Sequence, residues 1–128
     1  MTMNTKKEIG NISTEVRTSL LAKINSLWDA QPGRYELPKD HCERLAGARQ
    51  AFRAGDYFLA CTLLRGVNCP DAHNLCGVVH ETLGDHEGAR KSYQRALKAD
   101  RLCSAAEMNL RRSYELWHFG RSDIPFVL

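Results

Sequence analysis

The chain has 128 residues, of which 43% are hydrophobic and 26% are charged, the balance of an ordinary globular protein with a single core. Its net charge of +3 comes from basic residues spread along the chain, so composition alone does not favour nucleic acid as a ligand. The longest apolar runs are too short to cross a membrane, and the polar N-terminus lacks the apolar stretch of a secretory signal. We therefore expect a cytoplasmic protein that binds neither membrane nor nucleic acid.

The first residues, 1–10, are polar and end in a glycine, which predicts a disordered N-terminus. Over residues 11–31 apolar side chains recur at helical spacing, which predicts an N-terminal amphipathic helix. These side chains are Val16, Leu20, Leu21, Ile24, Leu27 and Trp28. The sequence Gln31-Pro32-Gly33 then ends the helix.

Five further helices are predicted between residues 38 and 119, separated by turns that contain glycine or proline. Their expected ranges are 39–54, 57–65, 70–83, 86–99 and 102–119. Pro70 suits the first turn of a helix, because its missing N–H costs nothing there. No segment shows the sustained alternation of a strand, so we expect an all-α fold. A tail of residues 120–128 follows, with the apolar end Ile124-Pro125-Phe126-Val127-Leu128.

Two stretches of the chain share one plan, in which a helix with small residues is followed by Gly-Asp and then by a helix with an early alanine. Aligning Gly55 with Gly84, 29 residues apart, also pairs Ala48 with Gly77, Ala60 with Ala89 and Leu64 with Tyr93. Two antiparallel helices approach closely only where small side chains face each other. We therefore expect Gly77 and Ala89 at a helix crossing, with Gly84 as a left-handed helix cap.

Residues 74–100 resemble a tetratricopeptide repeat. The positions of that pattern hold Cys76-Gly77, His80, Gly84, Ala89, Tyr93, Ala96 and Arg101, and Cys76, His80 and Arg101 depart from it. The preceding unit resembles a degenerate copy, and Leu110 and Tyr114 continue the register into a terminal capping helix. The resemblance implies a short α–α superhelix of tetratricopeptide-like helical hairpins over residues 38–119, with the amphipathic helix before it.

The same resemblance implies a protein–protein interaction module, of adaptor or co-chaperone type and without enzymatic activity, that holds a partner segment in a concave groove. By register, the expected partner-binding residues are Arg49, Phe52, Arg53, Asn74, Val78, Glu81, Met108 and Arg112. The three arginines in this set suggest an acidic partner segment, although ordinary solvent-facing arginines are the alternative. The apolar tail is a second candidate occupant of this groove.

A metal site is an alternative function for the second unit. Cys69, His73, Cys76 and His80 read C-x3-H-x2-C-x3-H, and the last three share one helix face where soft ligands for zinc converge. Structural zinc sites usually draw ligands from two separate elements. We therefore favour buried core residues at these positions over a zinc-binding regulator, and expect no cofactor.

Other functions compete less strongly. His41 and Cys42 are adjacent, and neighbours on a helix point about 100° apart, so they cannot act as a base and a nucleophile. Basic pairs such as Arg111-Arg112 lack the interleaved aromatic residues that stack on nucleic acid. The apolar stripe of the N-terminal helix needs cover, either as a cap on the first hairpin or as the interface of a self-assembling homodimer. The five cysteines are an odd number without paired spacing, which indicates reduced thiols.

Overall fold

The computed structural model describes residues 13–29 and 40–128, and within these ranges it contains helices and no strands, which confirms the all-α class. The helices are α2 (Thr14–Asp29), α3 (His41–Arg53), α4 (Tyr57–Leu64), α5 (Pro70–Thr82), α6 (His86–Ala99) and α7 (Ser104–Phe119). None of these described helices combines the length and the apolar character needed to cross a membrane. The disorder predicted for residues 1–10 and the helix end predicted at residues 31–33 lie outside the described ranges.

Three of the described helices begin at an aspartate that caps them. Asp40, Asp56 and Asp85 each accept a hydrogen bond from a backbone N–H two or three residues further along, at the starts of α3, α4 and α6. Such side chains satisfy one of the donors that a helix start leaves without a partner. Pro70 lies in the first turn of α5, as predicted. Because these signals are local, the predicted bounds of α3 to α7 lie within two residues of the observed ones.

The two Gly-Asp pairs fold into the same turn. Gly55 has a φ of +83° and Gly84 a φ of +87°, a region that favours glycine because it has no Cβ. The Asp56 N–H donates to the Ala51 carbonyl at 2.9 Å, and the Asp85 N–H donates to the His80 carbonyl at 2.8 Å. Both are the long bond of a Schellman motif. The internal similarity of the sequence therefore corresponds to a repeated turn between successive helices.

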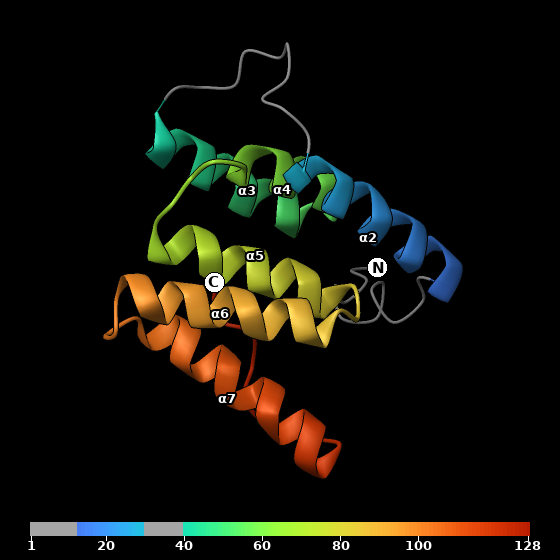
Figure 1. The fold of residues 1–128 in the computed structure, drawn as a ribbon, viewed down its shortest axis with the longest axis vertical. Helices are drawn as coiled ribbons and strands as arrows, with labels where there is room; N and C mark the ends of the chain where they lie inside the picture. Colours follow the sequence, from blue (N-terminus) through green and yellow to red (C-terminus); the bar gives the residue numbers. More distant parts are fainter. Residues whose placement is uncertain (1–12, 30–39) are drawn as a thin grey trace, which may run out of the picture.

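Helices α3 to α7 follow one another through the stack in sequence order, and α2 lies to one side of it (Figure 1). Helix α3 packs against α4, α5 against α6, and α7 against both α6 and α5, while α2 lies against α4. Positions that the repeat alignment pairs are buried in both units. They are Ala48, Ala60 and Leu64 in the first unit and Gly77, Ala89 and Tyr93 in the second.

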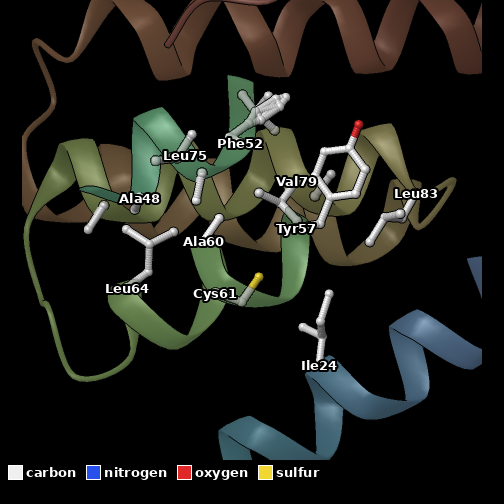
Figure 2. Close-up of a cluster of buried hydrophobic side chains, with 14 of the residues drawn as sticks. Ile24, Ala48, Phe52, Tyr57, Ala60, Cys61, Leu64, Leu75, Val79 and Leu83 are labelled. Atoms are coloured by element: carbon white, nitrogen blue, oxygen red, sulfur yellow. The ribbon is translucent and has the colours of Figure 1, made fainter. Parts of the chain in front are cut away.

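The N-terminal helix α2 places one fully buried side chain in the core. Ile24 is fully buried in the main hydrophobic cluster, and Figure 2 shows it beside Cys61 of α4. Leu20 and Leu27 are partly buried against the same cluster, whereas Val16 is 56% exposed. The side chain of Trp28 lies outside the described residues. In this structure α2 therefore covers the first hairpin with the middle and the end of its apolar stripe.

Candidate functional site

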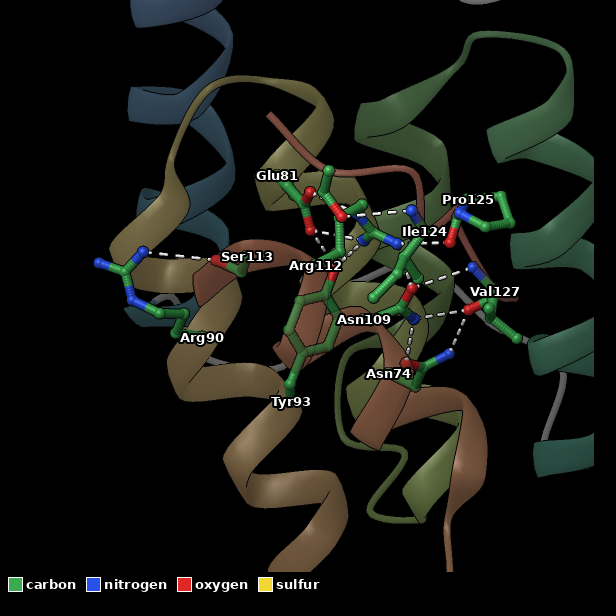
Figure 3. A network of polar contacts seen from close by, with 11 residues as sticks. Asn74, Glu81, Arg90, Tyr93, Asn109, Arg112, Ser113, Ile124, Pro125 and Val127 are labelled. Atoms are coloured by element: carbon green, nitrogen blue, oxygen red, sulfur yellow. Dashed lines mark hydrogen bonds and ion pairs between the residues drawn. The ribbon is translucent and has the colours of Figure 1, made fainter. Parts of the chain in front are cut away.

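A buried ion pair joins α5 to α7 (Figure 3). Arg112 Nε donates to Glu81 Oε2 at 2.8 Å, and Arg112 Nη2 donates to Glu81 Oε1 at 2.6 Å. The two side chains are only 5% and 2% exposed. Removing two charges from water is costly unless their remaining donors and acceptors also find partners. The surroundings of this pair therefore determine whether it is tolerated.

Side chains from α6 and α7 complete the ion pair. The Tyr93 hydroxyl donates to Glu81 Oε1 at 2.7 Å, and Arg112 Nη1 donates to Asn109 Oδ1 at 2.7 Å. Burial, and then the negative charge of Glu81, raise the pKa of the Tyr93 hydroxyl well above its usual value. Tyr93 therefore keeps its proton and stays a hydrogen-bond donor to the carboxylate.

Two asparagines extend this network away from the ion pair. Asn109 Nδ2 donates to Asn74 Oδ1 at 2.7 Å, and both residues are at most 1% exposed. The guanidinium of Arg112 holds the oxygen of the Asn109 amide, which fixes the direction of its nitrogen. We call the set Asn74, Glu81, Tyr93, Asn109 and Arg112 the polar network. It presents amide and guanidinium groups whose orientations are set by buried bonds.

The tail of the chain binds to the polar network through its backbone. The Val127 N–H donates to Asn109 Oδ1 at 2.9 Å, and the Val127 carbonyl accepts from Asn109 Nδ2 at 2.7 Å and from Asn74 Nδ2 at 2.8 Å. The Pro125 carbonyl accepts from Arg112 Nη1 at 2.6 Å. Figure 3 shows the tail passing across these side chains. Each of these bonds uses a main-chain atom of the tail, so the contact does not depend on a polar side chain in the bound segment.

Two side chains of the tail also contact the helices. Arg112 Cζ lies 4.2 Å from the centroid of the Phe126 ring, within the range of a cation–π interaction. Leu128 packs against the hydrophobic core. Before these residues, the Ser122 hydroxyl donates to Glu115 Oε1 at 2.7 Å and accepts from the Ile124 N–H at 3.2 Å. This turn directs the chain back towards α5 after the end of α7.

Three of the predicted partner-binding residues meet in the polar network, namely Asn74, Glu81 and Arg112. Phe52 and Val78 are buried in the hydrophobic cluster instead. The other three predicted residues take no part in the bonds of the network. Arg49 pairs with Asp71 at 3.7 Å, and Arg53 and Met108 are exposed. The predicted residues that meet are therefore fewer than the register of the sequence suggested, and they lie on α5 and α7.

Sequence reasoning did not assign Asn109 or Tyr93 to the groove. A usable signal was present, because Asn109 follows Asn74 by 35 residues, close to the roughly 34-residue tetratricopeptide period. The predicted register placed Met108 in the groove instead, but Met108 is 42% exposed and Asn109 is fully buried. A shift of one residue turns a helix by about 100°, which moves a side chain to another face.

A cavity of about 440 Å³ is lined by residues of α2, α4, α5 and α6. It includes three of the four candidate zinc ligands, His73, Cys76 and His80. Both histidines bond to other residues: His73 Nε2 is 2.7 Å from Asn68 Oδ1, and His80 Nδ1 is 3.0 Å from Asp85 Oδ2. Among the described residues, no group of three or more His, Cys, Asp or Glu side chains lies close enough to hold a metal ion. The four candidate ligands, Cys69 included, therefore do not form a metal site in this structure.

Burial also shifts the pKa values of two thiols and one histidine in this part of the molecule. Burial raises the pKa of the Cys61 and Cys76 thiols above their usual value. Burial, with a further contribution from Arg95, lowers the pKa of His73. Because nucleophilic attack needs the thiolate, thiols held protonated by burial are poor nucleophiles.

Taken together, the polar network offers donors and acceptors for a main chain, with a cation positioned under an aromatic ring. Such an arrangement can hold an extended segment, and the tail of this chain occupies it. No protein-family model, curated protein or solved structure matches this chain.

Proposed function

We propose that this protein is a protein–protein interaction module that holds an extended segment of a partner between α5 and α7. The observation that carries the proposal is the bonding of one tail residue, Val127, through both its N–H and its carbonyl to the Asn109 amide, with Asn74 adding a bond to the carbonyl. A side-chain amide that pairs with both groups of one residue recognises a main chain much as a neighbouring strand does. Side chains of the partner then set specificity.

We further propose that the hairpins form a short tetratricopeptide-like superhelix, with this groove on its concave face. Two observations support the proposal: the identical Gly-Asp turns and the shared burial of positions that are 29 residues apart. Helices α3, α5 and α7 would be the first helices of successive units, and α5 contacts both of the others. Bound segments in such arrays lie across the first helices.

The proposed role is that of an adaptor or co-chaperone-like protein in the cytoplasm, without catalysis. In the polar network the charge of Arg112 is paired with Glu81 and the proton of Tyr93 is held by burial, so these groups are poised for binding and not for proton transfer. The acidic partner suggested by the arginines stays a prediction. Its basis is weaker for Arg112, whose charge Glu81 already balances.

Panning a display library of random peptides tests the proposal. The target is the full chain with Val127→Pro, which removes the tail N–H that donates to Asn109. We expect selected peptides to bind at least about tenfold more weakly when Asn109→Asp is added, because the carboxylate cannot donate to a carbonyl and repels it. The matched control is Gln50→Glu, the same kind of change at an exposed position of α3.

The outcome depends on comparing these two changes. Selected peptides that lose affinity with Asn109→Asp and keep it with Gln50→Glu support a groove between α5 and α7. Peptides that bind equally well to both variants, or a library that yields no binder, contradict the proposed function. Circular dichroism on each variant establishes that the helices are intact before binding is compared.

A further inference from the structure

The tail has the features of a bound ligand, although it belongs to the same chain. Its hydrogen bonds to the polar network all involve the main-chain atoms of Pro125 and Val127. The residue between them, Phe126, lies over Arg112, and Leu128 inserts against the core. A tail that merely ended near α7 would not need two fully buried asparagines directed at one of its residues.

We infer that residues 124–128 mimic the partner segment and compete with it, an inference that rests on the proposed function. The partner would offer an extended segment with an aromatic residue over Arg112 and an aliphatic residue at the position of Leu128. Its main chain would make the bonds that Val127 and Pro125 make. The groove is therefore self-occupied until such a segment displaces the tail.

The connection between tail and helix sets the strength of this competition. Helix α7 ends at Phe119, and the Ser122 turn returns the chain to the groove within a few residues. A short tether of this kind gives an effective concentration of the order of millimolar. The apparent affinity for a partner falls by the fraction of molecules whose groove is open. A free segment at micromolar concentration thus needs a higher intrinsic affinity than the tail.

The expected partner is apolar at its contact points, for a reason visible in the groove. Charges inside the polar network are already balanced, since Arg112 pairs with Glu81 and both are buried. An acidic side chain placed over Arg112 would compete with Glu81 for the same guanidinium. An aromatic ring uses the face of that guanidinium and leaves its edge bonds intact.

The test adds a fluorescent peptide with the sequence of residues 121–128 to the full-length chain and measures binding by anisotropy. Val127→Pro in the chain removes the N–H that donates to Asn109 Oδ1. The tail should therefore bind less tightly to the polar network. We expect this variant to bind the peptide about tenfold more tightly than the unmodified chain does. Val127→Thr, which keeps the N–H and the branched shape, is the matched control and should bind like the unmodified chain.

A second peptide that itself carries V127P checks that the groove recognises the main chain, and it should bind at least about tenfold more weakly to the Val127→Pro chain. Equal affinity of the unmodified and Val127→Pro chains for the first peptide would show that the tail does not compete. Absence of binding to every chain, or equal binding of both peptides, would show that the tail is no mimic. Each of these results overturns the inference and leaves the proposed function to the library experiment.

Hydrogen exchange gives an independent measurement on the unmodified chain, should the Val127→Pro chain lose helix. The Val127 amide, bonded to Asn109, should exchange more slowly than an unbonded tail amide. Adding excess unlabelled peptide should speed its exchange at least severalfold, because the tail is displaced. An unchanged rate at peptide concentrations that saturate the groove would exclude displacement.

Discussion

At the scale of single residues, Gly77 decides where an aromatic ring lies. A Cβ built on Gly77 would come within 2.4 Å of Tyr93 Cε1, much closer than atoms can approach. The atoms nearest to such a Cβ all belong to the ring of Tyr93. The missing side chain lets the ring lie against the backbone of α5, from where its hydroxyl reaches Glu81 at 2.7 Å.

Replacing Gly77 by alanine should lower the free energy of unfolding by about 1–3 kcal/mol, because overpacking outweighs the helix propensity gained. Gly47→Ala is the matched control within α3, where the added Cβ would meet only the flexible end of Leu63 at 3.2 Å. The control should change stability by less than about 1 kcal/mol. Urea unfolding of both variants measures the difference, and equal stabilities would contradict this account of the Tyr93 contact.

At the scale of helices, α5 owes its polar content to its central position. It contacts α3, α4, α6 and α7, and it buries Asn74, His80 and Glu81 along with its apolar residues. A helix surrounded in this way cannot send these groups into water, so neighbouring helices must supply their partners. Arg112 of α7 and Tyr93 of α6 do so for Glu81. The polar network thus ties α7 to α5 as well as forming the groove.

Breaking this pair from one side should be costly. Arg112→Leu leaves Glu81 buried without its cation, and we expect it to lower the free energy of unfolding by about 3–5 kcal/mol. Adding Glu81→Leu should recover a large part of that loss, because no uncompensated charge is then buried. A double-mutant cycle by urea unfolding measures the coupling. If the double variant lost as much stability as the two single variants together, the two side chains would not be energetically coupled.

At the scale of the whole molecule, α2 and the tail each cover part of a short set of packed helices. Two repeated units are fewer than the three or more that stable arrays usually need. Helix α2 covers α4 through Ile24, and the tail covers the groove between α5 and α7. The first of these contacts favours a capping role for α2 over the alternative in which its stripe joins two copies.

Shortening Ile24 tests that role. Ile24→Ala should lower the free energy of unfolding by about 2–4 kcal/mol, the usual cost of a cavity in a core, whereas Val16→Ala at an exposed position of the same helix should change it by less than about 0.5 kcal/mol. The loss should be the same at low and high protein concentration. A loss that grows with protein concentration would indicate that α2 joins two copies of the chain.

Much of the fold could be predicted from the sequence because its signals are local. Helical periodicity, the Gly-Asp turns and Pro70 predicted the bounds of α3 to α7 to within two residues. Each of these features depends on atoms only a few residues apart. The candidate site was harder to predict, since Asn74, Glu81 and Arg112 were predicted but Asn109 and Tyr93 were not, and Phe52 and Val78 turned out to be buried in the core.

By itself, then, the sequence determined an all-helical chain of paired helices with a repeated turn. The tertiary structure decided which faces meet: that Asn109 and not Met108 points into the groove, that Glu81 and Arg112 neutralise each other, and that the tail lies across them. These contacts join residues 13 to 53 positions apart. Local periodicity does not determine these contacts. Turning a helix by one residue about its axis changes which side chains face its neighbours and leaves its own hydrogen bonds unchanged.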